Sequence, residues 1–376
     1  MTGAGAAGFP GAAVVLAGKD GATLGTFTGV HGDDGFGVDV AGPGDVDADG
    51  FVDVVVGAPQ TTTSGGTYAG RVRVFSGFDG TVLHTIDGGT PGEQLGSSVG
   101  RFGDFDADGH ADFVMGVTKD GTGGVNAGAA YVVSGKTGGI LASFFGNTPG
   151  DLYGFSCDGV GDVDGDGVTD LAGVAKPLFP NLVHSVRVDS GATGQPIHQF
   201  GGVGTPWYAQ NVSRMGDLDF DGRADVLVSL FPTGTGPYEV HVMSGATGLT
   251  LAKTSGPGEI GWAVSDAGDV NGDGQLDFLA SKAGFDWGAY AFSPTCGSIT
   301  KYGSACPNAG GFLPKITLLE GCATPGGEIR LTTQAGSITN SVAALVVGAT
   351  PAAVPLPGCT FLVGPPLAVS FLPTLF

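Results

Sequence analysis

The segment GDVDGDGVTD, residues 161–170, places four aspartates within nine consecutive positions. Like charges this close repel one another, so such crowding is expected where a cation offsets the repulsion. The residues fit the pattern D-x-[DN]-x-D-G-x-x-D, with acidic side chains at positions 1, 3, 5 and 9, and the glycine at position 6 permits a sharp bend. The segment therefore predicts a tight loop whose carboxylates converge on a metal ion.

The same pattern recurs four more times in the 376-residue chain, and the five copies start at Asp45, Asp104, Asp162, Asp217 and Asp269. Successive starts are 59, 58, 55 and 52 residues apart, which is the regular spacing of a repeat architecture. Each period has two halves that read as β-hairpins, with alternating or continuous apolar runs and S-G-x-x-G turns. Four strands per period predict an all-β chain folded as a β-propeller.

The two ends of the repeat array are irregular. Residues 12–29 repeat the second half of a period without its first half, and residues 288–294 begin a further copy and stop. The N-terminal half-blade either completes the fifth blade and closes the ring, or further blades precede it and the ring is open. We expect five or six blades, with an N-terminal extension at 1–11, the propeller at 12–293 and a C-terminal domain at 294–376.

Calcium is the cation that best fits these loops, because hard oxygen ligands in a flexible set of six or seven suit Ca²⁺ better than Mg²⁺ or Zn²⁺. The loops contain 19 of the 36 acidic residues of a chain with net charge −21, so five ions would reduce that charge to −11. Asp/Gly turns without metal are the alternative, which five in-phase copies disfavour. The predicted ligands of up to five Ca²⁺ ions are Asp45, Asp47, Asp49, Asp53, Asp104, Asp106, Asp108, Asp112, Asp162, Asp164, Asp166, Asp170, Asp217, Asp219, Asp221, Asp225, Asp269, Asn271, Asp273 and Asp277.

The first halves of the periods resemble FG-GAP repeats, the blades of the integrin alpha-subunit propeller. Phe36-Gly37 and Gly57-Ala58-Pro59 match the pairs that give the repeat its name, and Leu95-Gly96 matches less closely. The resemblance covers roughly residues 12–293. It implies that calcium is structural and that ligands bind the opposite face of the ring. Integrin propellers have seven blades, so five metal loops depart from that pattern.

Composition changes after residue 294, where the repeat is lost. The tail resembles a small β-sandwich module at the C-termini of secreted proteins of environmental, Planctomycetes-like bacteria, and we expect it to be truncated. It holds four of the five cysteines, which predict one or two disulfides in an oxidising compartment, with Cys157 left over. No signal peptide is visible, yet the composition favours an extracellular or cell-envelope protein. The apolar stretches are too short or too interrupted by proline to span a membrane.

The acidic balance argues against nucleic-acid binding, which needs a basic surface. The six histidines are scattered over different repeats, and no nucleophile elbow is present, so we expect no enzyme. The first hypothesis is a non-enzymatic, extracellular, calcium-binding propeller that mediates adhesion or binds a protein or surface ligand. Alternatives are a carbohydrate-binding propeller that uses Trp207, Trp262 or Trp287, and a non-catalytic part of a polysaccharide-processing system. A polysaccharide-degrading enzyme whose catalytic part lies elsewhere or was lost is a weaker hypothesis.

Overall fold

The computed structural model contains strands and no helix among the residues that it describes. Side chains and backbone are described over most of the first 302 residues. Beyond them only the backbones of six strands are described. The described ranges are 11–17, 22–32, 34–177, 184–201, 207–256, 259–269, 275–283, 286–295, 298–302, 314–316, 330–334, 342–347, 352–356, 359–363 and 367–369.

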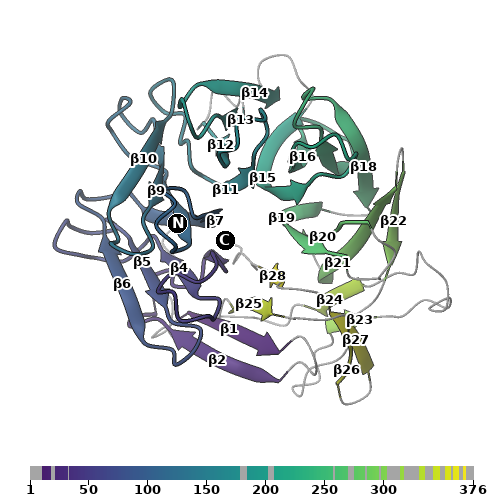
Figure 1. Cartoon of the computed structure of the whole chain (residues 1–376), viewed down its shortest axis with the longest axis horizontal. Helices are drawn as coiled ribbons and strands as arrows, with labels where there is room; N and C mark the ends of the chain where they lie inside the picture. The colour runs from purple at the N-terminus through teal and green to yellow at the C-terminus, as the bar shows by residue number, and fades with distance from the viewer. Residues whose placement is uncertain are drawn as a thin grey trace.

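The five repeats form five antiparallel sheets that surround a common axis, so the chain is an all-β, five-bladed propeller (Figure 1). In each blade the first strand lies nearest the axis and later strands lie progressively further out. The predicted four strands per period are confirmed. The strands of the first blade are β3 (Val40–Ala41), β4 (Val54–Ala58), β5 (Arg71–Phe75) and β6 (Val82–Asp87); of the second, β7 (Leu95–Gly103), β8 (Asp112–Val117), β9 (Ala129–Val133) and β10 (Ile140–Phe145); of the third, β11 (Cys157–Gly161), β12 (Asp170–Ala175), β13 (Ser185–Asp189) and β14 (Pro196–Gly201); of the fourth, β15 (Trp207–Gly216), β16 (Asp225–Pro232), β17 (Tyr238–Met243) and β18 (Thr250–Gly256); and of the fifth, β19 (Glu259–Gly268), β20 (Asp277–Ala283), β21 (Asp286–Thr295) and β22 (Ser298–Tyr302).

The hydrophobic core lies between neighbouring blades. Val54, Val55 and Val56 of β4 are at most 1% exposed, as expected for a strand covered on both faces. One cluster joins Val55 in the first blade to Met115 in the second, and similar clusters join the blades that follow. Because each sheet is buried against its two neighbours, the ends of the strands and their connecting loops supply the exposed functional surfaces.

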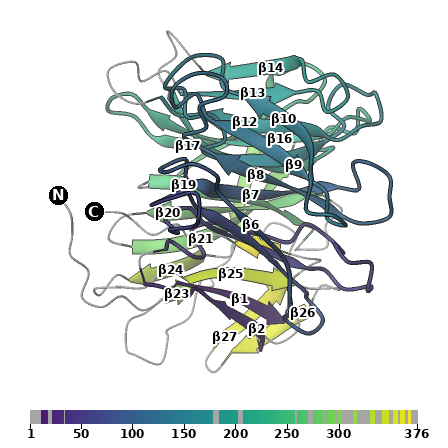
Figure 2. The same cartoon turned by 90° about the vertical axis from the view of Figure 1, so that its left-hand side faces the viewer.

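A further sheet, the closing sheet, lies between the first and fifth blades (Figures 1 and 2). It consists, from the outside inward, of β2 (Thr23–Thr28), β1 (Ala12–Ala17), β25 (Val342–Val347) and β28 (Leu367–Val369). β1 runs parallel to β25, with Ala12 opposite Val342. The N-terminal half-blade therefore does not complete the fifth blade; it pairs with strands from the C-terminal tail.

The tail adds strands to two sheets of the ring. β24 (Arg330–Gln334) pairs with β21, β23 (Pro314–Ile316) pairs with β24, and β26 (Ala352–Leu356) and β27 (Cys359–Val363) form a hairpin. The separate C-terminal domain and the boundaries at 11 and 293 stay predictions, because much of the tail and residues 1–10 lie outside the described residues. The predicted tail disulfides stay predictions for the same reason. Within the described part of the chain, no helix has the length and apolarity needed to cross a bilayer.

Cys157 is the left-over cysteine of the sequence prediction, and the structure describes it as a free, buried thiol. Its sulfur lies 3.0 Å from the Ser98 hydroxyl. Burial raises the pKa of the Cys157 thiol to about 12. The thiolate is the reactive form of cysteine, so this side chain is inert packing between the second and third blades.

His184 gives the propeller a pH-dependent stability. Its ring is 7% exposed and packs 4.7 Å from the Tyr208 ring, with Nδ1 3.3 Å from the Ala209 carbonyl oxygen. Burial lowers the pKa of His184 from 6.5 to about 4. The unfolded chain therefore takes up the proton first, and the free energy of unfolding is expected to fall as pH drops from about 6.5 towards 4, by up to about 3 kcal/mol.

Denaturant unfolding at several pH values, with saturating calcium, measures this effect. The wild-type chain should lose more stability between pH 7 and pH 5 than His184→Gln, which cannot take up the proton. Equal losses in the two proteins would contradict the assignment.

Candidate metal centres

Each metal loop, defined as positions 1 to 9 of the Asp pattern, connects the first strand of a blade to the second. The loop at residues 45–53, for example, follows β3 and ends where β4 begins. Position 4 adopts a left-handed conformation in the four loops that are fully described, with φ of 62° at Ala48, 58° at Ala107, 83° at Gly165 and 60° at Phe220. The glycine at position 6 has φ between 88° and 94° in the same loops. These two positions curl the backbone so that alternate side chains converge.

The aspartate at position 1 holds the loop in this shape. In the first loop, the Asp49 N–H donates to Asp45 Oδ1 at 3.0 Å and the Gly50 N–H donates to Asp45 Oδ2 at 2.7 Å. The same two backbone donors serve the first aspartate of the other described loops: Asp104, Asp162 and Asp217. A carboxylate oxygen has a second lone pair, so these bonds leave position 1 able to bind a cation as well.

In each of the four loops, three carboxylates come together, with one oxygen of each lying within 4.8 Å of the others. Positions 1 and 3 belong to every group. The third member is position 9 in the first, third and fourth loops and position 5 in the second. The groups are Asp45, Asp47 and Asp53; Asp104, Asp106 and Asp108; Asp162, Asp164 and Asp170; and Asp217, Asp219 and Asp225.

The aspartate at position 5 accepts a hydrogen bond from the backbone of its own loop. Asp49 Oδ1 accepts the Phe51 N–H at 2.8 Å, and Asp108, Asp166 and Asp221 accept the N–H two residues ahead in the same way. Its role as a ligand remains a prediction. In the fifth loop, Asp269 and the fully buried Asp277 are described, whereas Asn271 and Asp273 lie outside the described residues.

The aspartate at position 9 has a structural role that the pattern alone did not reveal. Asp53 is fully buried; its Oδ2 accepts the Val46 N–H at 2.6 Å and its Oδ1 accepts the Gly77 N–H at 2.8 Å. Gly77 belongs to the S-G turn of the hairpin β5–β6, so one carboxylate joins the metal loop to the outer hairpin. The corresponding pairs are Phe105 and Gly135 on Asp112, Val163 and Gly191 on Asp170, and Leu218 and Gly245 on Asp225. The signal in the sequence is an S-G dipeptide whose glycine follows each of these four aspartates by 20–24 residues.

Burial makes the ninth aspartate costly to ionise without a cation. It raises the pKa of Asp53, Asp170 and Asp225 to about 6, against the opposing effect of the two backbone N–H donors. The neighbouring loop carboxylates raise these pKa values further. A bound divalent cation reverses this balance, because it favours the ionised form of every carboxylate around it.

The donor set fits a calcium ion. All the gathered side-chain ligands are oxygens, which suits a hard cation. In the fourth loop, Asp219 Oδ1 is buried and accepts no hydrogen bond. A buried carboxylate oxygen without a donor is costly, and a cation within the group formed by Asp217, Asp219 and Asp225 satisfies it. The four acidic clusters are thus consistent with Ca²⁺-binding loops.

Two parts of the chain match models of known repeats. Residues 36–75 match the FG-GAP repeat, and residues 217–280 match the FG-GAP-like repeat. The first match spans the metal loop of the first blade, and the second spans the metal loops of the fourth and fifth blades. The chain is a five-bladed β-propeller with FG-GAP repeats, and it is similar to integrin alpha subunits.

Among its relatives, integrin alpha-4 of Xenopus laevis is 30% identical over 140 residues, which cover 34% of this propeller chain and 13% of the relative. Integrin alpha-V of Gallus gallus is 28% identical over 216 residues, which cover 51% of this chain and 20% of the relative. The FG-GAP propeller thus aligns with about a fifth or less of the length of these relatives, and the predicted bacterial origin and C-terminal module stay predictions.

Proposed function

We propose that this FG-GAP propeller binds calcium in its metal loops as a structural ion and uses the opposite face of the ring to bind a protein or surface ligand. The observation that carries the proposal is the position of the ninth aspartate, which contacts both the metal loop and the outer hairpin of its blade. A calcium ion neutralises the clustered carboxylates of that loop. The ion then stabilises the blade as a whole, and the face formed by the other loop ends is free for recognition.

The proposal includes no chemical reaction. Groups with shifted pKa values, such as Asp170 and His184, are bound to backbone atoms inside blades, which is a structural arrangement. Relatedness to integrin alpha subunits supports an extracellular or cell-envelope location and a role in adhesion or surface binding.

A carbohydrate-binding role has less support. Trp262 packs edge-to-face on Phe231, with ring centroids 5.4 Å apart, and Trp207 lies 6.5 Å from the His241 ring. Both indoles are half-buried, so they contribute to packing and offer little open face for a sugar.

Binding of the full chain to arrays of extracellular-matrix proteins and glycans, with calcium and with EDTA, tests the proposal. We expect binding to a protein or surface ligand that is lost or weakened in EDTA, because the blades that present the recognition loops loosen. Binding to glycans alone would replace the proposal with the carbohydrate-binding alternative. Protein binding that is equal in calcium and EDTA would contradict a structural role for the ion.

A further inference from the structure

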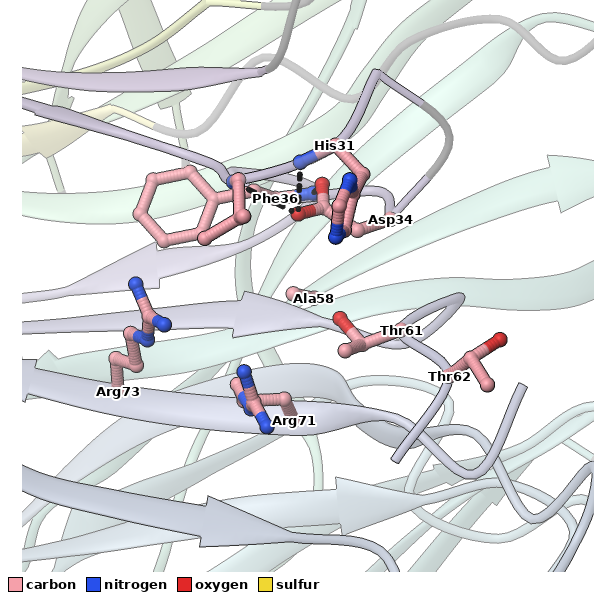
Figure 3. Close-up of a pocket in the computed structure, with 9 residues that line it drawn as sticks. His31, Asp34, Phe36, Ala58, Thr61, Thr62, Arg71 and Arg73 are labelled. Carbon is pink, nitrogen blue, oxygen red and sulfur yellow. Dashed lines mark hydrogen bonds between the residues drawn. The ribbon is translucent and has the colours of Figure 1, made fainter. Parts of the chain in front are cut away.

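A small pocket of about 70 Å³ lies in the first blade, beside the connection that leads from β2 into that blade. Figure 3 shows Arg73 and Arg71 rising from β5 below it, Thr61 at one side, and Asp34 and Phe36 above. Thr61 follows the end of β4, whereas the metal loop precedes its start. The pocket therefore lies at the end of the blade away from the calcium site, and no metal-loop residue lines it.

Two buried polar atoms, on residues that line this pocket, have no hydrogen-bond partner. They are Thr61 Oγ1, on a residue that is 6% exposed, and Arg73 Nε. Buried donors left without acceptors are costly, and native structures rarely keep them without a ligand or water. Arg73 Nε can only donate, and the Thr61 hydroxyl is able to donate, so a single acceptor group can satisfy both.

Arg71 and Asp34, which also line the pocket, already have partners. Arg71 forms an ion pair with Asp87 through Nε and Nη2. The Asp34 carboxylate accepts N–H groups from Val30, His31 and Phe36, which fixes it as a cap of its own loop. Asp34 is therefore not the acceptor that Thr61 and Arg73 lack.

The second blade contains that acceptor within its own chain. Thr61 corresponds to Asp120, since each N–H donates to the carbonyl three residues back and each carbonyl accepts from the glycine before the next strand. Arg73 corresponds to Tyr131, which precedes the S-G turn by the same three residues. Tyr131 Oη donates to Asp120 Oδ2 at 2.6 Å. The first blade thus has the Thr61 hydroxyl, a donor, at the position where the second blade has the Asp120 carboxylate.

In the third and fourth blades, the residue that corresponds to Arg73 also has hydrogen-bond partners within the chain. Arg187 donates to Asp189 at 2.7 Å, to Asn147 at 2.8 Å and to the Phe145 carbonyl at 2.9 Å. His241 Nε2 lies 2.6 Å from Glu239 Oε2. In these two blades, as in the second, the polar residue at this position contacts a carboxylate of its own blade, whereas no such contact is made by Arg73 Nε.

We propose that the blade-one pocket binds a small carboxylate, which takes the place that Asp120 occupies in the second blade. One carboxylate oxygen accepts from the Arg73 guanidinium and the other accepts from the Thr61 hydroxyl. A planar guanidinium matches a planar carboxylate, and charge-assisted hydrogen bonds of this kind are about twice as strong as neutral ones. The volume suits a group of a few heavy atoms, such as acetate or the end of an acidic side chain.

Calorimetric titration of the calcium-saturated full chain with sodium acetate, against sodium chloride at matched ionic strength, tests the proposal. We expect acetate-specific binding in the wild type and at least about tenfold weaker binding in Arg73→Gln. Arg214→Gln, which removes an exposed arginine of the fourth blade, is the matched control and should bind like the wild type. Absence of acetate-specific binding in the wild type, or equal binding in Arg73→Gln, would overturn the proposal.

A second variant keeps the test informative if Arg73→Gln folds poorly. Thr61→Asp supplies the carboxylate from the chain itself, so it should raise the melting temperature and abolish acetate binding. Wild-type acetate affinity in a folded Thr61→Asp protein would overturn the proposal. A parallel titration with amidated Gly-Asp-Gly distinguishes the sources: binding of acetate alone assigns a free acid, and binding of both assigns side-chain carboxylates as well.

Discussion

Removal of calcium with EDTA is expected to lower the melting temperature of the full chain by more than about 10 °C. A ligand that binds only the folded state adds about 2.7 kcal/mol per site when its free concentration is 100 times its dissociation constant. Four described acidic clusters, each part of the connection between two strands, multiply that effect. Calorimetric or circular-dichroism melts at matched ionic strength measure it.

Calcium added back should restore the melting temperature, and an equal concentration of magnesium should restore much less of it, because the loops offer a flexible oxygen shell. Superimposable melts in calcium and EDTA would rule out calcium as a structural ion. Equal rescue by both ions would indicate a general screening of the acidic loops.

Replacement of a ninth aspartate is expected to weaken the fold even in the absence of calcium. Asp170→Ala leaves the buried N–H group of Val163 and the half-buried N–H group of Gly191 without their acceptor, which costs about 2–4 kcal/mol. Asp164→Ala, at position 3 of the same loop, removes a carboxylate of the metal group without breaking a bond to the outer hairpin. It should therefore cost stability in calcium and little or none in EDTA.

Urea unfolding of both variants, each in calcium and in EDTA, separates the two roles. The expected result is that Asp170→Ala is less stable than the wild type under both conditions, and that Asp164→Ala differs from it only with calcium. Equal stability of all three proteins in EDTA would show that the ninth aspartate acts as a ligand alone.

The sequence predicted the metal loops and the blades because both repeat along the chain. The loop pattern appears five times in phase, so chance copies of Asp162, Asp164 and their counterparts were improbable, and the blades followed from the period. The bond from Asp170 to Gly191 was not predicted, because the S-G dipeptide that marks it also fits an ordinary hairpin turn and does not by itself name a side-chain partner. The pocket at Thr61 and Arg73 was also hidden, because it arises where one blade departs from the others.

The pairing of β1 with β25 had no signal in the sequence. β1 is an ordinary apolar strand that fits the edge of any blade, and its partner β25 lies about 330 residues away. Neither propensity nor periodicity can select between such partners. The prediction correctly recognised a half-blade at residues 12–29. It was wrong, however, to offer the fifth blade as the partner, because the half-blade pairs with strands of the tail.

That parallel pair also determines when the ring can be completed during synthesis. β1 emerges from the ribosome before the five blades, but its partner β25 emerges only after all of them have been made. Until then the edge of β1 is exposed, and exposed strand edges promote association with other chains. The blades between them rely on neighbouring contacts along the chain and can fold in order, whereas closure is a contact of very large sequence separation and is expected to be the slow, final step.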